Sequence, residues 1–464
     1  MTDAIKRERS GALQRFKPYP AYNDSGVEWL GEIPAHWEAA KLWQVGRAMS
    51  GGTPAREERT YWDGDIPWVS PKDMKRRLID SSQDTVTERA IEETGIKLIA
   101  PPVVLIVVRG MILAHSFPVA ITTVPVTINQ DMKALTFRDG ILPLFMGWLF
   151  EGIGKRLLTA VVEEAAHGTK AIRMDQWRSV IVPVPPDGEQ RGISAFLDRE
   201  TARIDALVAK KQRLIELLQE QRTARITRAV TKGLDASVPL KDSGVEWLGK
   251  IPLHWESLAL SRVSLSKCDG PFGSGLKSEH YSESGIRVVR LQNIGWTEFL
   301  NGDRAYIDQT YAGQLGEHSV KADDVLIAGL GDEGHPVGRA CVAPAEIEPA
   351  MVKADCFRFR LDRRRAVPRF AAFQLSATAT AAAGSLATGA TRARMNLTTT
   401  ASRKVALPPL REQQAIVDAL DGQSERHRAL IAKVSEAVER LEELRTALIS
   451  AAVTGKIDVR GDVA

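Results

Sequence analysis

Largely apolar positions near the end of the chain recur at alternating intervals of three and four residues. They are His427, Leu430, Val434, Ala437, Leu441, Leu444 and Leu448. This heptad period is typical of helices that pack against one another as a coiled coil. The pattern therefore predicts a long helix with one apolar stripe. Gly422, near its start, leaves open whether the helix is kinked there or begins as a short separate segment.

A second stretch of the same kind lies near the middle of the chain. Between Glu189 and Lys232 there is no proline, and Gly192 is the one glycine. Its apolar positions follow one another at intervals of three, four or seven: Ile193, Leu197, Ile204, Leu207, Leu214 and Leu218. A helix of this extent would be about 60 Å long, which is too long for one compact domain. We expect the two helices to pair with each other, antiparallel because the chain returns through a domain between them.

The segments that precede each helix alternate short apolar runs with glycine and proline. Runs at 66–70, 103–108 and 119–128 precede the first helix, and runs at 286–291, 325–330 and 356–361 precede the second. A helical stretch is expected at 142–162. This alternation predicts an α+β globular domain ahead of each helix. We call these two domains head 1 and head 2.

A segment of fifteen residues occurs twice and explains this order. Asp24–Glu38 (DSGVEWLGEIPAHWE) and Asp242–Glu256 (DSGVEWLGKIPLHWE) differ only at positions 32/250 and 35/253. The copies are 218 positions apart, far beyond the period of a solenoid. The helices match at a separation of 223, for example ALVAK at 206–210 and ALIAK at 429–433, so head 2 is five residues longer. The chain is therefore an internal duplication with pseudo-twofold symmetry.

The duplication sets the expected domain boundaries. A basic arm (1–23) precedes head 1 (24–184), a central helix (185–236), head 2 (242–407) and a C-terminal helix (408–458). The tryptophans of the repeated segment are expected to pack on a domain body, and His36 and His254 to form structural hydrogen bonds. By symmetry, the first copy should begin near the end of the second helix, around Asp458.

Composition adds few constraints. The 464 residues are 44% hydrophobic and 26% charged with a formal net charge of +4, which is ordinary for a soluble protein and leans only mildly toward polyanions. The three cysteines favour a reducing compartment without a disulfide framework. The N-terminus lacks the apolar core of a signal peptide, and no apolar run is long enough to span a bilayer. We expect a cytoplasmic protein that is not associated with a membrane.

Candidate chemistry lies in polar loops of the two heads. Aligning the heads preserves the apolar positions but changes polar ones, as at Lys72/Gln292 and Asp73/Asn293. Lysine, arginine, glutamine and asparagine are suited to base edges and phosphates. The candidates for DNA binding are Thr53, Arg56, Lys72, Lys75, Arg76, Thr169, Lys170 and Arg173 in head 1, and Ser274, Lys277, Arg290, Gln292, Asn293, Thr391, Arg392 and Arg394 in head 2. Solvated surface charges and neutral drift of loops are the alternatives.

No motif indicates catalysis. Gly329, Gly331 and Gly334 spell GxGxxG, but Pro336 and a strand pattern follow where a dinucleotide fold needs a helix. There is no phosphate-binding loop GxxxxGK[ST], no zinc-ligand spacing and no catalytic triad pattern. We expect no catalytic residue, metal or cofactor on this chain.

Together these motifs resemble the specificity (S) subunit of type I restriction-modification systems. The resemblance rests on the duplicated DSGVEWLG-x-IP-x-HW segments, on GGTPAREERTYWDGDIPWVSPKDM (51–74), on INQDMKAL (128–135) and on the helix openings PVPPDGEQRGISAFL (183–197) and LPPLREQQAIVDAL (407–420). It implies two target recognition domains, each reading half of an asymmetric bipartite sequence of double-stranded DNA, separated by paired helices that set the spacing. It also implies two methyltransferase (M) subunits, restriction (R) subunits in the full complex, and S-adenosylmethionine, ATP and magnesium on those partners.

The apolar stripes are the expected contacts between the helices or with a partner subunit. The candidates are Ile204, Leu207, Leu214, Leu218, Leu430, Val434, Leu441, Leu444 and Leu448. Two alternatives remain. One is a two-headed scaffold for protein interactions that does not read DNA sequence, and the other is a self-contained nuclease or methyltransferase.

Overall fold

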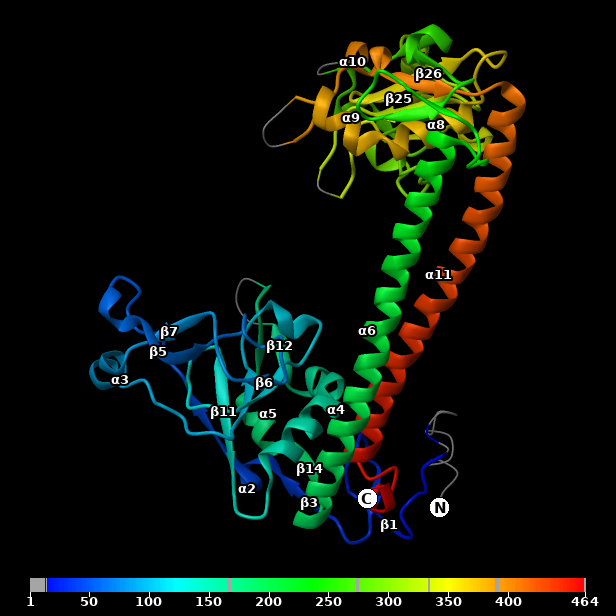
Figure 1. Cartoon of the computed structure of the whole chain (residues 1–464). Coiled ribbons are helices and arrows are strands. Elements are labelled where there is room, and N and C mark those ends of the chain that lie inside the picture. Colours follow the sequence, from blue (N-terminus) through cyan, green and yellow to red (C-terminus); the bar gives the residue numbers. More distant parts are fainter. Residues whose placement is uncertain are drawn as a thin grey trace. The chain divides into compact units, whose positions relative to one another are not determined.

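The structure, a computed structural model of the whole chain, describes residues 13, 15–164, 168–272, 275–332, 334–388 and 392–462 (Figure 1). It divides into two compact units. The first contains Met1–Gln212 and Glu436–Ala464, and the second contains Arg213–Ser435. Each unit therefore comprises one head and part of each of two long helices. In the described part of the chain, no helix is both long and apolar enough to cross a membrane.

The body of head 1 is a five-stranded sheet covered by one long helix. The strand order is β4 (Gly46–Ser50), β11 (Met132–Phe137), β8 (Val104–Val107), β9 (Val119–Thr122) and β6 (Leu78–Ile79). Helix α4 (Pro143–Val161) begins with a proline at its first turn and buries Trp148, Leu149 and Phe150 against this sheet. Gly147 lets it approach closely, because a Cβ there would lie 2.7 Å from Ile121 Cδ1.

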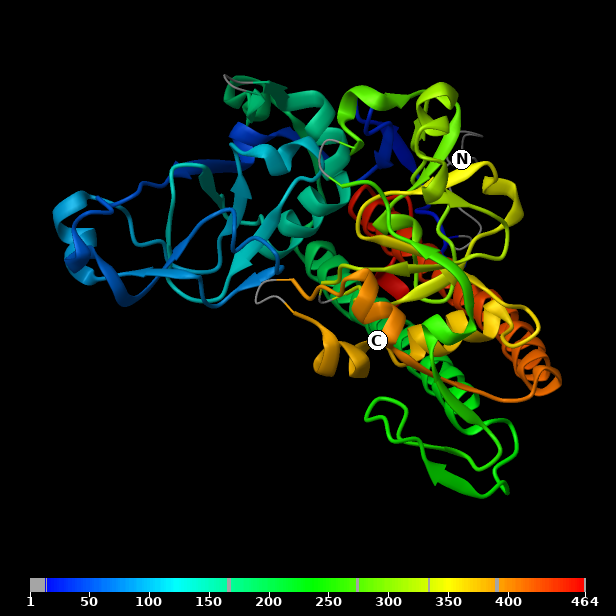
Figure 2. The ribbon, with the colours of Figure 1, turned by 90° about the horizontal axis from the view of Figure 1, so that it is seen from above.

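A smaller lobe extends from this body. It contains β10 (Thr127–Ile128), β5 (Trp62–Val69) and β7 (Asp84–Val86) in that order, with α3 (Glu88–Thr94). Trp68, Val86, Ala90 and Ile96 form its own small core. Figures 1 and 2 both show α3 at the end of the head that is furthest from α4.

Head 2 repeats this plan with altered sheets. One sheet has the order β18 (Ser264–Cys268), β26 (Cys356–Leu361), β23 (Val325–Ala328) and β24 (Ala340–Val342). The other has the order β19 (Tyr281–Ser282), β21 (Tyr306–Ile307), β20 (Ile286–Val289), β25 (Ala350–Val352) and β22 (Ser319–Val320). Helix α8 (Pro368–Ala377), followed by α9 (Ala379–Leu386), takes the place of α4 and packs on β23 and β24. A short helix, α7 (Gln309–Gly313), lies between β21 and β22.

Each head is closed at its base by a strand pair that joins its entry to its exit. In head 1, β3 (Glu38–Lys41) pairs with β14 (Ile181–Val184), next to α2 (Leu42–Val45) and α5 (Met174–Ser179). In head 2, β17 (Glu256–Ala259) pairs with β27 (Lys404–Leu407), which follows α10 (Leu397–Ser402). The first strand of each pair follows a repeated segment, and the second precedes a long helix.

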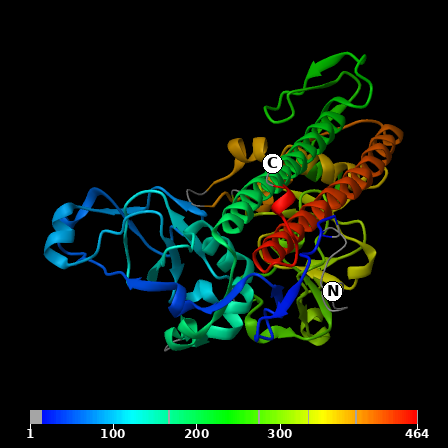
Figure 3. The same ribbon diagram turned by 90° about the horizontal axis from the view of Figure 1, so that it is seen from below.

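The two predicted long helices are present as α6 (Asp187–Lys232) and α11 (Leu410–Val453). Helix α11 runs without interruption through Gly422. In the first unit, Ile204 of α6 and Leu448 of α11 belong to one core, and Arg445 Nε lies 2.9 Å from Asp205 Oδ1. In the second unit, the later part of α6 shares a core with the first part of α11. Figure 3 shows the two helices side by side.

Burial along these helices differs in part from the predicted stripes. Ile204, Val434 and Leu448 are buried, and Leu218, Leu441 and Leu444 are half-buried. Leu207, Leu214 and Leu430 are 40%, 42% and 44% exposed. They were predicted to contact either the other helix or a partner subunit, and this exposure shows that they are not buried between the helices, whereas the contact with a partner subunit stays a prediction. The half-buried residues beside them are Val208, Ile215 and Ile431. The apolar surface of the helices is wider than one stripe, and the half-buried position is the residue that directly follows each of these leucines.

Both copies of the repeated segment form the same hairpin. In the first, β1 (Tyr22–Asp24) pairs with β2 (Glu32–Pro34), and in the second, β15 (Leu240–Asp242) pairs with β16 (Lys250–Pro252). The first copy lies against the end of α11, because Asp458 N donates to Lys17 O at 2.8 Å and Tyr22 Oη donates to Gly455 O at 3.0 Å. The expectation that this copy begins near Asp458 is confirmed.

Candidate nucleic-acid interface

The histidine–tryptophan pair of the repeated segment holds the first turn of α6. His36 Nε2 lies 2.6 Å from Glu189 Oε1, and Trp37 Nε1 donates to Glu189 Oε2 at 3.0 Å. Tyr19 Oη donates to the same carboxylate at 3.0 Å. A carboxylate is also favoured at a helix N-terminus by the helix dipole. The expected structural role of this histidine is therefore confirmed.

The next residue of α6 fixes the head itself. Gln190 is fully buried, and its Oε1 accepts a hydrogen bond from Leu142 N, the N-cap of α4, at 2.8 Å. Its Nε2 donates to Gly140 O and Pro185 O, both at 2.8 Å. The amide thus satisfies one backbone donor and two backbone acceptors at the junction of the helix with the head.

The second unit repeats both contacts. Glu412 lies 2.7 Å from His254 Nε2 and accepts from Trp255 Nε1 at 3.1 Å. Gln413, also fully buried, accepts from Val367 N, the N-cap of α8, at 2.7 Å. Its Nε2 donates to Arg365 O at 3.1 Å and Pro408 O at 2.8 Å. The glutamate–glutamine pair at each helix start therefore holds both the repeated segment and the head.

An arginine from the other long helix supports each head as well. In the first unit, Arg445 Nη1 of α11 lies 2.8 Å from Glu151 Oε1 of α4. In the second unit, Arg222 Nη2 of α6 lies 2.8 Å from Glu298 Oε1. Arg222 and Arg445 occupy equivalent positions, 223 residues apart. Each head is thus fixed by the duplicated contacts of the helix starts and by an equivalent arginine, although the glutamate that this arginine pairs with lies at a different position in each head.

The first candidate loop of head 1 carries a stacked arginine. The Cζ atom of Arg56 lies 3.9 Å from the centroid of the Trp62 ring and 5.0 Å from that of Trp68, and its Nη2 pairs with Asp84 at 3.1 Å. The Arg56 side chain remains half exposed. Thr53 Oγ1 donates to Gln130 Oε1. Stacking and ion pairing hold this guanidinium in one orientation.

The second candidate loop of head 1 is built on a buried aspartate. Asp73 Oδ2 accepts from Ser70 N at 2.8 Å, and its Oδ1 accepts from Gln83 N at 2.8 Å. Lys72 and Lys75 are exposed, and neither has an ion-pair partner among the described residues. Arg76 pairs with Asp80 at 2.9 Å. The two lysines are thus the free cations of this loop.

The late loop of head 1 carries compensated charge. Lys170 Nζ pairs with Glu164 at 2.8 Å, and Arg173 lies 3.8 Å from both Glu163 and Asp175. Thr169 is half-buried beside them. A polyanion approaching this loop would compete with these carboxylates, so the loop contributes less positive potential than its sequence suggested.

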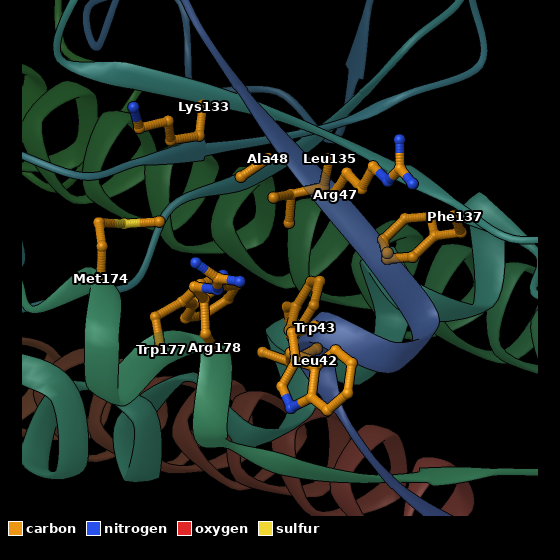
Figure 4. Close-up of a pocket in the computed structure, with 12 residues that line it drawn as sticks. Leu42, Trp43, Arg47, Ala48, Lys133, Leu135, Phe137, Met174, Trp177 and Arg178 are labelled. Carbon is orange, nitrogen blue, oxygen red and sulfur yellow. The ribbon is translucent and has the colours of Figure 1, made fainter.

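A pocket of about 700 Å³ lies in the body of head 1, lined by residues of α2, β4, β11, α4 and α5 (Figure 4). It is lined by Leu42, Trp43, Gly46, Arg47, Ala48, Lys133, Leu135, Phe137, Phe150, Met174, Trp177 and Arg178. Figure 4 shows Trp177 and Arg178 at one side and Trp43 and Phe137 across from them. None of these lining residues is acidic, and Arg47, Lys133 and Arg178 give the pocket a positive charge.

In head 2, two of the predicted DNA contacts serve the fold. Arg290 forms a bidentate ion pair with Asp303, with Nε 2.7 Å from Oδ2. Asn293 is fully buried, and its Nδ2 donates to Leu300 O at 2.9 Å and Asp303 O at 2.8 Å. The prediction that Asn293 contacts DNA was therefore wrong, because its amide closes a local turn. The neighbouring Gln292 is exposed.

The other described candidates of head 2 are exposed, and one of them, Arg394, pairs with an aspartate that the sequence did not single out. Arg394 Nη2 lies 2.7 Å from Asp355 Oδ1. Arg392, the other candidate on the loop of Arg394, is exposed.

Burial, with the charge of Asp355, raises the pKa of Asp269 to about 6, and the Oδ1 atom of Asp269 has no hydrogen-bond partner in the described structure. Lys277 lies 3.7 Å from Glu279. Ser274 and Thr391 lie outside the described residues. No group of His, Cys, Asp and Glu residues suited to a metal occurs where the chain is described.

Comparison with known proteins gives consistent results. Residues 34–217 and 294–440 match the family model described as type I restriction modification DNA specificity domain. The chain is 35% identical over 221 residues to the EcoR124I/EcoR124II specificity subunit of Escherichia coli, an alignment that covers 47% of this chain and 54%, about half, of that protein. It is 24% identical to the putative MjaX specificity subunit of Methanocaldococcus jannaschii, over 93% of this chain and 96% of that one.

The fold has a counterpart among solved structures. A chain from a structure described as the basis of complex assembly and conformational transition of the type I R-M system superposes with a TM-score of 0.68 at 15% identity, over 91% of this chain and 98% of that one. The family model covers well over half of the present chain, in two parts that fall in the two duplicated halves. This chain belongs to the family of type I restriction-modification DNA specificity proteins.

Proposed function

We propose that this chain is the DNA-reading specificity subunit of a type I restriction-modification complex. Each head would read one half of an asymmetric bipartite sequence in double-stranded DNA. The observation that carries this proposal is that both heads are fixed by the same duplicated contacts, to Glu189/Glu412 and Gln190/Gln413, while their loop tips differ. A shared support with different polar tips is what two readers of two different half-sites require.

The long helices would act as a spacer and as a docking surface. We propose that α6 and α11 pair as an antiparallel coiled coil and so set the spacing between half-sites, supported by the ion pair of Arg445 with Asp205 and by the shared cores. The exposed Leu207, Leu214 and Leu430 are the surface for two methyltransferase subunits. The chain itself is non-catalytic, and S-adenosylmethionine, ATP and magnesium belong to the methyltransferase and restriction subunits.

Duplex binding in the presence of the methyltransferase subunit tests this function. We expect a preferred sequence to emerge against random competitor, and Lys72→Ala and Lys75→Ala each to reduce the slope of log affinity against log salt by about 0.9, the value for one phosphate contact. Lys155→Ala, an exposed lysine on α4 of the same head, is the matched control.

Two results would contradict the proposal. If wild-type protein shows no sequence preferred over competitor, the chain does not read DNA. If Lys155→Ala lowers the salt slope as much as the loop variants, the second loop of head 1 is not where the phosphates lie.

A further inference from the structure

A third loop in each head is bonded to the late candidate loop in the same way. In head 1, the loop after β8 donates from Gly110 N to Lys170 O at 2.9 Å, and Ile172 N donates to Val108 O at 2.9 Å. In head 2, Gly331 N donates to Ala393 O at 3.0 Å and Met395 N to Gly329 O at 2.9 Å. Because the duplicated heads share this connection, whatever approaches the late loop also meets the third loop.

In head 1 the tip of this loop is apolar and exposed. Met111 and Ile112 are 62% and 39% exposed, whereas Leu113, the next residue of the same short 3-10 helix (Met111–Ala114), is only 2% exposed and lies in the main core. Leu113 N also donates to Gly110 O at 3.2 Å. The tip is therefore anchored from below, and it holds two adjacent apolar side chains in solvent. A single exposed apolar residue is ordinary on a protein surface. Two adjacent ones on an anchored tip, beside the exposed Arg109, indicate a surface that binds a partner.

The same loop of head 2 is held by a buried arginine and carries polar residues at its described positions. Arg339 is 4% exposed, and it donates from Nε to Ile294 O at 2.7 Å, from Nη2 to Leu291 O at 3.0 Å and from Nη1 to Leu330 O at 3.1 Å. Arg339 thus ties the third loop to the loop of Arg290 and Gln292. At the tip, Asp332 Oδ1 accepts from His335 N at 2.9 Å, and the His335 side chain is 64% exposed. The loop is therefore anchored by hydrogen bonds in both heads, and the described residues at its tip differ in chemistry.

We propose that the third loop of head 1 is an additional reading loop, in which Met111 and Ile112 make apolar contact with base pairs of the half-site read by that head. This rests on the proposed function. Apolar side chains contact thymine methyl groups or unstack base steps, and both require a firmly anchored tip next to cations that hold the phosphates. Arg109 is such a cation, while the neighbouring Lys170 is paired with Glu164.

Substitution of the tip in the complex with the methyltransferase subunit tests this proposal. We expect Met111→Ala and Ile112→Ala each to weaken binding of the preferred duplex on the order of tenfold, because an apolar contact of this size is lost. The salt slope should stay unchanged since no phosphate contact is removed. Sequence preference should relax only in the half-site read by head 1. Leu144→Ala, a 43% exposed leucine on α4, is the matched control and should bind like wild type.

Several outcomes would overturn the proposal. Unchanged affinity in both variants, or equal relaxation of both half-sites, would show that the tip does not contact bases. Loss of methyltransferase subunit binding in sedimentation would make the tip a protein contact instead. Thermal midpoints equal to wild type exclude misfolding, and Met111→Leu should restore binding. If wild-type protein lacks any sequence preference, the proposed function fails, whereas a wild-type preference with unaffected variants refutes the third loop alone.

Discussion

Replacing Gln413 by alanine should loosen head 2 while leaving head 1 unchanged. The side chain is fully buried and makes three hydrogen bonds, one from Val367 N and two to the carbonyls of Arg365 and Pro408. At about 1 kcal/mol for each hydrogen bond, their loss costs roughly 3 kcal/mol, because alanine offers no partner to these three backbone groups, of which the Pro408 carbonyl is buried and the other two are partly buried. Since about 1.4 kcal/mol corresponds to a factor of ten, local opening should become about 100-fold more frequent.

Hydrogen exchange measured by peptide resolves where this loosening occurs. Gln413→Ala should speed exchange at Val367 and the following amides of α8 about 100-fold and leave Leu142 and the start of α4 at wild-type rates. Gln190→Ala should do the reverse, because Gln190 makes the equivalent bonds in the first unit. Gln414→Ala is the matched control, since that residue is exposed and its Nε2 bonds only to Asp418 at 2.8 Å among the described residues.

The reasoning would be refuted if exchange at Val367 rose less than about threefold over the Gln414→Ala control, equivalent to less than roughly 0.7 kcal/mol. It would also fail if each variant loosened both heads equally. In that case the glutamines would stabilise the helices in general and would not hold individual heads.

Three further predictions concern stability and pH. Trp255→Phe keeps a buried aromatic ring but removes the pyrrole part of the indole and its hydrogen bond to Glu412, so urea unfolding should show a loss of about 2 kcal/mol in the second unit. Trp37→Phe should cost less, because Tyr19 also donates to Glu189, and equal losses would contradict this. Asp269 has a raised pKa of about 6, so its protonated form contributes stability that is complete below its unfolded pKa near 4 and is lost as pH rises through 6. Asp269→Asn should therefore raise the urea midpoint at pH 8 and give no gain near pH 4. The same gain at both pH values would exclude the ionisation of Asp269 as its cause. Burial lowers the pKa of Arg77 to about 10, and neither of its Nη atoms has a hydrogen-bond partner among the described residues. Arg77→Met should therefore change the unfolding free energy by less than about 1 kcal/mol in thermal melts, whereas a loss above about 2 kcal/mol would mean that its pairing with Glu151 and Asp198 dominates.

The large-scale organisation was predictable because it depends on period and repetition. The proline-free stretches before Lys232 and before Val453 could form little else than long helices, and the duplicated DSGVEWLG segments placed the first copy near Asp458. It was less predictable which face of each helix is buried. Leu207 is followed by Val208, and Leu430 by Ile431, so two adjacent seams fit the same pattern, and only the partner surface decides which one is buried.

The candidate site was predictable only as a set of loops. Lys72 and Lys75 are exposed as expected. Asn293 has the side-chain amide of a base-reading residue, but this amide donates its hydrogen bonds to the carbonyls of Leu300 and Asp303. Sequence cannot show whether a polar group is satisfied internally. Gln190 and Gln413 had a usable signal, since the same dipeptide EQ opens both helices. Met111 had none, because a methionine after an apolar run is normally part of the core.

The pairing of early α6 with late α11 has a consequence for synthesis. The core of the first unit includes Phe196 from the first half of the chain and Ile449, Val453, Ile457 and Val459 from its end. The second unit is one continuous segment, Arg213–Ser435. During translation, head 2 can complete its core before head 1, although head 1 is made first. The core of the first unit therefore stays incomplete until residues 449–459 have been synthesised, so its apolar surface is exposed to aggregation for as long as they are missing.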